Sequence, residues 1–267
     1  MKFLIAIAAV LVAGCATRSV VPTTDAATEL APTGTLRVAV LTSNPIIASK
    51  DAGSGALSGT AVSLGRDLAF RAGILARMID YPAIPLLMAH ANAGVWDVAV
   101  VAIDPARRNL VDFAPAHLVA DGFLTVLVPP DSKARVMADV DQPGMKIAAV
   151  RGAAPLMILD RTLKNAKTVA ADNEDAAFAL MRDGQADGYA QNRFMLRARQ
   201  KTLAGSRVLE DAFAGLQLAF ALPRNRPQAL KFVHDFIEEA KENGLIEAAI
   251  RDAGMTGEVG VAPLVGH

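Results

Sequence analysis

The sequence has little of what several common kinds of functional site require. Cys15 is its only cysteine, so an internal disulfide is excluded. Its four histidines, His90, His117, His234 and His267, lie far apart and lack the spacing of metal ligands. Aromatic residues make up only 5% of the chain, which argues against a surface that stacks on bases or sugars. We therefore expect no metal site and no cofactor.

The chain also lacks an excess of charge of either sign. Its 27 Lys and Arg residues balance 27 Asp and Glu residues, whereas a protein that binds nucleic acid carries a basic face. We expect no nucleic-acid partner. With 52% hydrophobic residues, a chain of 267 residues is long enough for one large domain or two modest lobes with a substantial core.

The N-terminal stretch MKFLIAIAAVLVAGC has the layout of a secretory signal, because Lys2 precedes an apolar run too short to span a bilayer. Its last four residues, Val12–Cys15, resemble the lipobox of bacterial lipoproteins, in which the cysteine is lipid-modified and becomes the new N-terminus. We expect residues 1–14 to be removed as a signal peptide and Cys15 to anchor the protein to a membrane. The alternative is a secreted protein whose cysteine stands there by chance. Residues 15–33 are rich in Thr, Ala, Pro and Ser, which predicts a flexible tether.

Beyond the tether, short apolar runs alternate with segments of helical periodicity. Strands are predicted over residues 36–41, 97–103, 146–150, 168–171, 187–191 and 216–222. Helices are predicted over residues 63–78, with Ser63 as N-cap, and over residues 151–163, 174–184, 227–244 and 245–254. The order strand, helix, strand favours an α/β fold with parallel sheets covered on both faces.

Two arginines follow directly on the predicted strand 97–103, in the stretch DVAVVAIDPARRNLVDFAPAH. The pattern Pro-x-Arg followed by Val-Asp-Phe-x-Pro stands in line with GTLRVAVL, SGTAVSLGRDLA, GMKIAAVRGAA and GQADGYAQN. This order of motifs resembles the family 3 periplasmic solute-binding proteins of ABC importers, from about Gly34 to Pro263. The resemblance implies a two-lobed, type II periplasmic-binding-protein fold, in which two parallel-sheet lobes are joined by two crossing strands. Lobe 1 is then residues 34–124, completed by 222–263, and lobe 2 is residues 125–221.

The resemblance also implies a binding site in the groove between the lobes. Arg107 would grip a ligand carboxylate, and a guanidinium suits this role because its planar fork binds a carboxylate with two hydrogen bonds. The alternative for Arg107 is a surface residue at a strand end, and for Arg108 a solvated neighbour is favoured. Further candidates from cleft geometry are Ile103 and Asp104 beside Arg107, Gly152 and Ala153 at a helix start, and Asn44 and Thr60.

Two positions depart from the family pattern. Amino-acid-binding members carry an acidic residue five positions after the Asp of DG or DA, and here that position is Asn192. An asparagine cannot neutralise a buried ammonium, which puts an ordinary α-amino acid ligand in doubt. Asp121 is the candidate for supplying the missing charge from another direction. His117 replaces a tyrosine, and we expect it to be a packed residue rather than a pH sensor or a ligand contact.

These observations predict the substrate-binding component of an ABC transporter, lipid-anchored outside the cytoplasmic membrane, in the periplasm or at the cell surface. Its partners would be a small carboxylate-bearing solute and the membrane permease, and it would not be an enzyme. The first alternative is a periplasmic, dehydratase-like enzyme on the same scaffold, for which His117 and Asp121 are the only acid or base candidates. The second is a ligand sensor that takes no part in transport.

Overall fold

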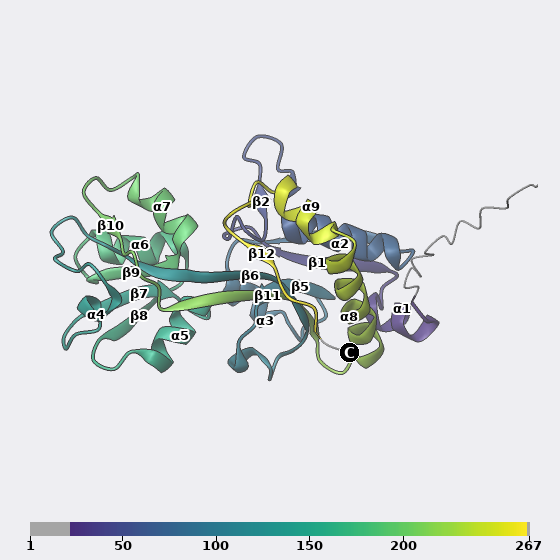
Figure 1. The fold of residues 1–267 in the computed structure, drawn as a ribbon. Coiled ribbons are helices and arrows are strands. Elements are labelled where there is room, and N and C mark those ends of the chain that lie inside the picture. Colours follow the sequence, from purple (N-terminus) through teal and green to yellow (C-terminus); the bar gives the residue numbers. More distant parts are fainter. Residues whose placement is uncertain (1–21, 266–267) are drawn as a thin grey trace, which may run out of the picture.

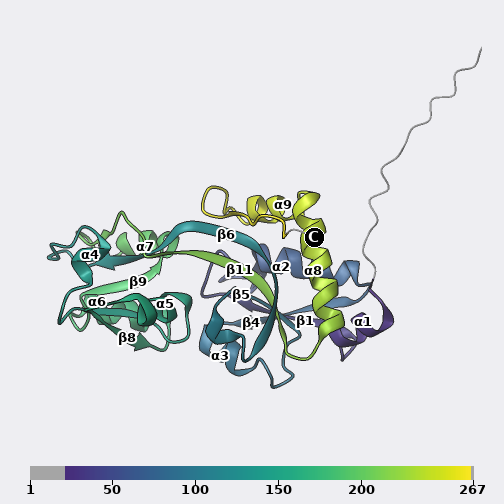
Figure 2. The same cartoon turned by 60° about the horizontal axis from the view of Figure 1, so that its bottom comes forward.

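The computed structural model describes residues 22–265, which form two lobes connected by a narrow waist (Figures 1 and 2). The waist consists of β6 (Val111–Val128) and β11 (Ala214–Pro223), which pair with each other antiparallel. One sheet continues through both lobes in the order β4-β1-β5-β11-β6-β9-β7-β8. The predicted signal peptide and Cys15 lie outside the described residues.

The first lobe holds the strands on the β4 side of the waist. β1 pairs parallel with β4 and β5, and β11 pairs antiparallel with β5. Its β1 sequence, TLRVAVL, is almost wholly buried because helices cover both faces of the sheet. The elements of this lobe besides β6 and β11 are α1 (Thr24–Leu30), β1 (Thr35–Leu41), β2 (Ser49–Lys50), β3 (Leu57–Ser58), α2 (Thr60–Arg71), β4 (Leu75–Tyr81), α3 (Ile84–Ala89), β5 (Val98–Ala102), the 3-10 helix η1 (Pro105–Arg107), α8 (Pro227–Glu242), α9 (Leu245–Asp252) and β12 (Gly260–Val261).

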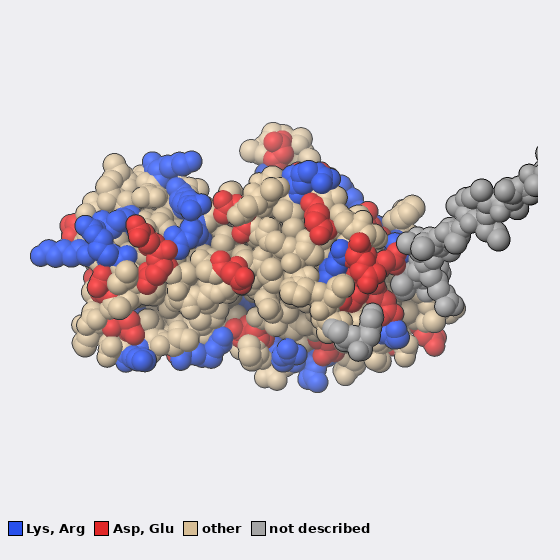
Figure 3. Space-filling model, viewed as in Figure 1, with Lys and Arg blue, Asp and Glu red and all other residues tan. Residues whose placement is uncertain are grey.

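The second lobe repeats the arrangement on a smaller scale. β7 pairs parallel with β8 and β9, and β9 pairs antiparallel with the end of β6. Besides the waist strands, its elements are α4 (Met137–Val140), β7 (Lys146–Val150), α5 (Ala154–Thr162), β8 (Lys167–Ala171), α6 (Glu174–Arg182), β9 (Gly188–Asn192), α7 (Arg193–Gln200) and β10 (Arg207–Val208). On the face drawn in Figure 3, basic and acidic side chains intermingle over both lobes, and neither sign dominates that face.

The predicted helix over residues 63–78 is wrong at both ends. α2 begins after Gly59 rather than at Ser63, and it ends at Arg71. Gly73, with a φ of 69°, then turns the chain in the left-handed region that favours glycine. Residues 75–81 are strand β4 at the edge of the sheet. Leu75 fitted the helical apolar stripe in the sequence, but in the structure it is 78% exposed.

The predicted tether over residues 15–33 is wrong for its second half, because residues 24–30 form α1. Thr23 caps this helix by accepting a hydrogen bond from the Ala26 N–H at 3.2 Å, and Leu30 is fully buried. The carboxylate of Glu29 accepts hydrogen bonds from two N–H groups in the first turn of α8. This carboxylate at a helix N-terminus joins α1 to α8, so the folded unit begins earlier than the composition indicates.

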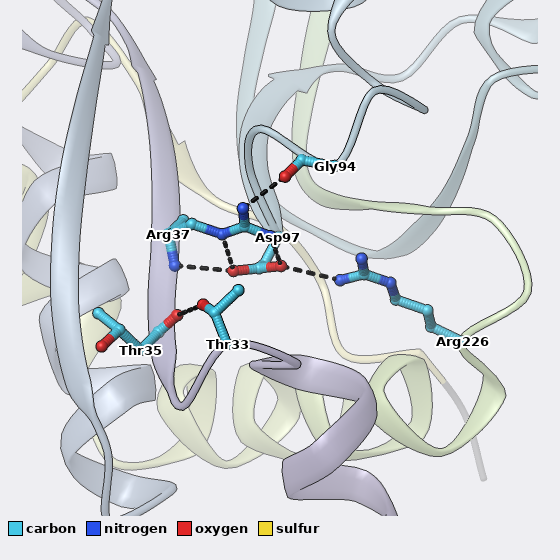
Figure 4. Close-up of polar contacts among 6 residues, drawn as sticks. All are labelled: Thr33, Thr35, Arg37, Gly94, Asp97 and Arg226. Atoms are coloured by element: carbon cyan, nitrogen blue, oxygen red, sulfur yellow. Dashed lines mark hydrogen bonds and ion pairs between the residues drawn. The ribbon is translucent and has the colours of Figure 1, made fainter.

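A buried carboxylate ties together three elements of the first lobe (Figure 4). The Asp97 side chain is fully buried and accepts hydrogen bonds from the Arg37 backbone N–H (3.0 Å), Nε (2.9 Å) and Nη2 (2.8 Å). Arg226, just before α8, donates to the same carboxylate at 3.2 Å. One acidic group thus links β1, the start of β5 and the start of α8.

Replacing Asp97 should therefore destabilise the fold. Asp97→Asn removes the charge that two largely buried arginines share, and we expect the free energy of unfolding to fall by about 3 kcal/mol. Urea unfolding followed by circular dichroism measures this change. Asp183→Asn is the control, since Asp183 pairs with Arg182 on the surface, and it should leave the midpoint unchanged. An equal loss in the two variants would contradict the assignment.

Candidate functional site

A pocket lies between the lobes, where the carboxyl ends of their parallel strands face each other. The ends of β1, β5, β7 and β9 all contribute to it, as expected for ligand sites in open α/β sheets. Its walls are mostly apolar: Leu41, Ile47, Ile84, Val101, Leu124, Val150, Leu216 and Leu218. Its polar side chains are Ser43, Asn44, Arg107, Asn173, Glu174, Gln191 and Asn192.

Arg107 places a buried positive charge at this pocket. It ends η1 directly after β5, and only 4% of its surface is exposed. Its guanidinium donates to the carbonyl oxygens of Ala102 (2.6 Å) and Gly152 (2.8 Å), while its Nε has no partner among the described residues. Burial lowers the pKa of Arg107 to about 10, although the nearby Asp104 charge opposes the shift. The group is therefore still charged at neutral pH, and it retains hydrogen-bond capacity.

Glu174 places a carboxyl group at the same pocket from the second lobe. It stands in the first turn of α6, and one of its oxygens accepts a hydrogen bond from the Gln191 side-chain amide at 2.8 Å. The other oxygen accepts one from the Tyr189 hydroxyl. Burial raises the pKa of Glu174, an effect that both hydrogen bonds and the Arg199 charge counteract. Glu174 is not among the site residues predicted from the sequence. The only signal for it there is an acidic residue at the start of a predicted helix.

Asn192 lines the pocket as a hydrogen-bond donor. It caps α7, because its Oδ1 accepts a hydrogen bond from the Met195 N–H at 2.8 Å. Its Nδ2 is buried and has no partner among the described residues. The capping bond fixes the orientation of the amide, so the group left for a ligand is an N–H donor.

Of the other predicted site residues, Asn44 and Ala153 also line the pocket. Thr60 does not, because its hydroxyl is buried and donates to the Ile46 carbonyl at 2.7 Å. Ile103 does not line the pocket either, and its N–H donates to the carbonyl oxygen of Gln217 at the waist.

Three further predictions of direct ligand contact are not supported by the pocket lining. Asp121 lies exposed in the middle of β6. Asp104 is buried and binds Arg161 of the second lobe, at 2.8 and 3.2 Å. Gly152 faces Arg107 through its carbonyl oxygen and lies outside the pocket lining. Both residues therefore stabilise Arg107 from outside the pocket lining, Asp104 through its charge and Gly152 through its carbonyl oxygen.

His117 is a packed residue, as expected. It is fully buried, its ring lies 5.3 Å from that of Phe220, and neither ring nitrogen has a partner among the described residues. Burial, together with the Lys241 charge, lowers the pKa of His117 to about 3, so the ring is neutral at physiological pH. Arg108 is exposed and lies over the ring of Phe113, away from the pocket lining.

Residues 22–265 contain neither a candidate metal cluster nor a helix that could span a membrane. This part of the chain has no group of three or more His, Cys, Asp and Glu side chains placed to hold a metal ion. None of its helices combines the length and the apolar character needed to cross a membrane.

Two α/β lobes on a two-strand waist, with a pocket between them, define a two-lobed ligand-binding protein. The sequence profile of the bacterial extracellular solute-binding proteins, family 3, matches residues 36–252, and the chain belongs to this family. The predicted family and fold class are thereby confirmed.

Solved structures share the fold at low sequence identity. The solute receptor for L-cysteine of Neisseria gonorrhoeae is 20% identical, with a TM-score of 0.74 over 90% of this chain and 100% of that one. Holo ArgBP from T. maritima is 22% identical, with a TM-score of 0.67 over 82% and 97%. The ancestral amino acid-binding protein AncCDT-1, a precursor of cyclohexadienyl dehydratase, is 22% identical, with a TM-score of 0.69 over 84% and 97%.

This chain also matches a short part of a much longer curated relative. The virulence sensor protein BvgS of Bordetella bronchiseptica is 30% identical over 157 residues, which is 58% of this chain. The match spans only 12% of the length of that sensor.

The buried carboxyl of Glu174 predicts a dependence of stability on pH. Because burial raises its pKa in the folded state, the folded protein binds this proton more tightly than the unfolded chain. The contribution is fully present below the ordinary glutamate pKa and is lost as pH rises through the raised value. We expect Glu174→Gln to gain stability relative to the wild type over that interval, and urea unfolding at a series of pH values measures it. A difference that stays constant with pH would contradict the shift.

Proposed function

We propose that this protein captures a small carboxylate-bearing solute between its two lobes. The observation that carries the proposal is the buried guanidinium of Arg107 at the pocket, which has carbonyl partners and an Nε without a partner among the described residues. A ligand carboxylate would supply the opposite charge that these partners lack, in a site where water is largely excluded. A ligand that contacts both lobes stabilises their closed arrangement, because the open arrangement lacks one set of contacts.

The remaining polar groups of the pocket favour a ligand that also carries an ammonium. Glu174 is a half-buried carboxylate held by two donors, and a cation is the partner that would offset the cost of its partial desolvation. Asn192 offers a donor, which suits a second contact to the ligand carboxylate. Among the proteins that share the fold, one is named a solute receptor for L-cysteine and ArgBP from T. maritima is named as arginine-bound, and each of these two ligands carries an ammonium beside a carboxylate. Glu174 brings to the pocket the negative charge that Asn192 cannot carry, and this supports an amino acid as the ligand.

Transfer of the bound solute to an ABC permease is the most direct use of such a protein. The signal-like N-terminus and Cys15 support a location outside the cytoplasmic membrane, with lipid anchoring. The similarity to BvgS supports the alternative of ligand sensing without transport. A pull-down from membranes, by this protein with and without ligand, distinguishes a permease from a sensor as the partner.

A second candidate function is catalysis at the same pocket, which the position of Glu174 favours. A buried carboxyl with a raised pKa is the kind of group that donates a proton to a leaving group. The two earlier acid or base candidates, His117 and Asp121, do not line the pocket. Nuclear magnetic resonance of the solute after incubation separates the two functions, since a binding protein returns its ligand unchanged.

Arg107→Ala should weaken ligand binding by at least about 30-fold. Removing the guanidinium leaves a buried ligand carboxylate unpaired, which costs at least about 2 kcal/mol, or about 30-fold in affinity. A thermal-shift screen against L-amino acids and small organic acids identifies the ligand, since saturation at a hundred times the dissociation constant stabilises by about 2.7 kcal/mol. Arg108→Ala is the matched control, because Arg108 is exposed and outside the pocket lining. Unchanged affinity in Arg107→Ala would refute the carboxylate site.

Glu174→Gln should remove the preference for an aminated ligand. The wild type should bind an L-amino acid at least about ten-fold more tightly than the same carboxylic acid without its amine, because only the former pairs with Glu174. Isothermal titration of both compounds with both proteins measures this ratio. Asp172→Asn is the control, as this neighbouring carboxylate is exposed and pairs with Arg151. A ratio that survives in Glu174→Gln would show that the ammonium binds elsewhere.

A further inference from the structure

An ion pair joins the two lobes beside the pocket without lining it. Asp104 follows β5 in the first lobe, and Arg161 lies in the last turn of α5 in the second. The guanidinium donates to both carboxylate oxygens, with Nη1–Oδ1 at 3.2 Å and Nη2–Oδ2 at 2.8 Å. The Asp104 side chain is 3% exposed, whereas that of Arg161 is 48% exposed. The pair is a two-pronged contact between a buried acid and a surface arginine.

Asp104 is at the same time part of the support for Arg107. Its Oδ1 accepts the Ala106 N–H at 2.9 Å and thereby caps η1, the short helix that ends in Arg107. Burial alone would raise the pKa of Asp104, but hydrogen bonds from Arg161 and Ala106, with the charges of Arg161 and Arg107, lower it. The carboxylate is thus ionised, and it lies between the arginine of the pocket and the arginine of the opposite lobe.

A second contact between the lobes lies next to this pair. Arg107 reaches across to the carbonyl oxygen of Gly152, just before α5. Both contacts join the η1 region of the first lobe to α5 and the loop before it. A third interlobe contact, the Arg197–Glu258 ion pair, is looser at 3.6 Å and has more exposed side chains. The Asp104–Arg161 pair is therefore the closer of these two interlobe ion pairs in the described chain.

We propose that Asp104 and Arg161 are positioning residues that favour the closed arrangement of the lobes before any ligand arrives. When the lobes separate, the carboxylate loses both hydrogen bonds from Arg161, while the cap on η1, which lies within the first lobe, stays in place. The pair thus biases the opening equilibrium and leaves the fold of each lobe intact. A pair with one exposed partner is weak, so the bias is about three-fold in the ratio of closed to open molecules.

The ratio of closed to open molecules is measured without a ligand, so the outcome is independent of the proposed function. The full chain, carrying Cys15→Ser, is spin-labelled at Lys164→Cys and Asp252→Cys, two exposed positions on opposite lobes. Double electron–electron resonance then gives the distribution of interlobe distances. In Arg161→Ala we expect the closed-to-open ratio to fall about three-fold. The control Arg151→Ala removes an exposed arginine whose partner, Asp172, lies on the same lobe, and it should match the wild type.

Two further measurements separate positioning from general loss of structure. Arg161→Lys should restore part of the closed population, because it keeps the charge and loses the two-pronged geometry. Added salt should open the wild type and have little effect on Arg161→Ala. An unchanged distance distribution in Arg161→Ala, or an equal shift in Arg151→Ala, would overturn the inference. Neither result depends on whether Arg107 binds a carboxylate.

Discussion

A guanidinium buried where two lobes meet, with neutral carbonyl oxygens as its hydrogen-bond partners, is the constraint on which the rest of this site depends. The charge of Arg107 is retained at neutral pH even though burial lowers its pKa. Such a charge is costly to bury, so its surroundings must compensate. They do so with the Asp104 carboxylate behind it and with carbonyl oxygens from both lobes. What the described residues do not supply is an anionic partner for this guanidinium on the pocket side.

The continuous sheet explains how two lobes can share one site and still move. β6 pairs with β11 and β12 in the first lobe and with β9 and β10 in the second, so this strand is part of the sheet in both lobes. The β6–β11 ladder is irregular, with register shifts along β11, and β6 has Gly122 at a φ of 59° next to the exposed Asp121. Bulges and a left-handed glycine are where a paired ribbon bends with little loss of hydrogen bonding. Asp121 therefore belongs to the waist rather than to the ligand.

The sequence was a good guide where the controlling signal is local. The strand over residues 146–150 is apolar after Lys146, and the prediction matches β7 at both ends. Arg107 stands in a compact motif, and its position at a strand end followed from that motif. Glu174 could not be found this way, because its burial depends on Tyr189 and Gln191, which only the β9 pairing brings near. The boundary between α2 and β4 was missed for a similar reason, as pairing with β1 overrides the helical periodicity around Leu75.

The substitution at Asn192 shows how the second lobe redistributes its polar groups. An acid at this position would pair with an ammonium from the end of β9, but Asn192 carries no charge, caps α7 with its Oδ1 and leaves its Nδ2 donor without a partner among the described residues. The acidic group that the second lobe places at the pocket is Glu174, at the start of α6, and two hydrogen-bond donors hold its carboxyl there. The pocket therefore offers a cation, a neutral donor and an anion from three different elements. These are the groups with which the proposed zwitterionic ligand would pair.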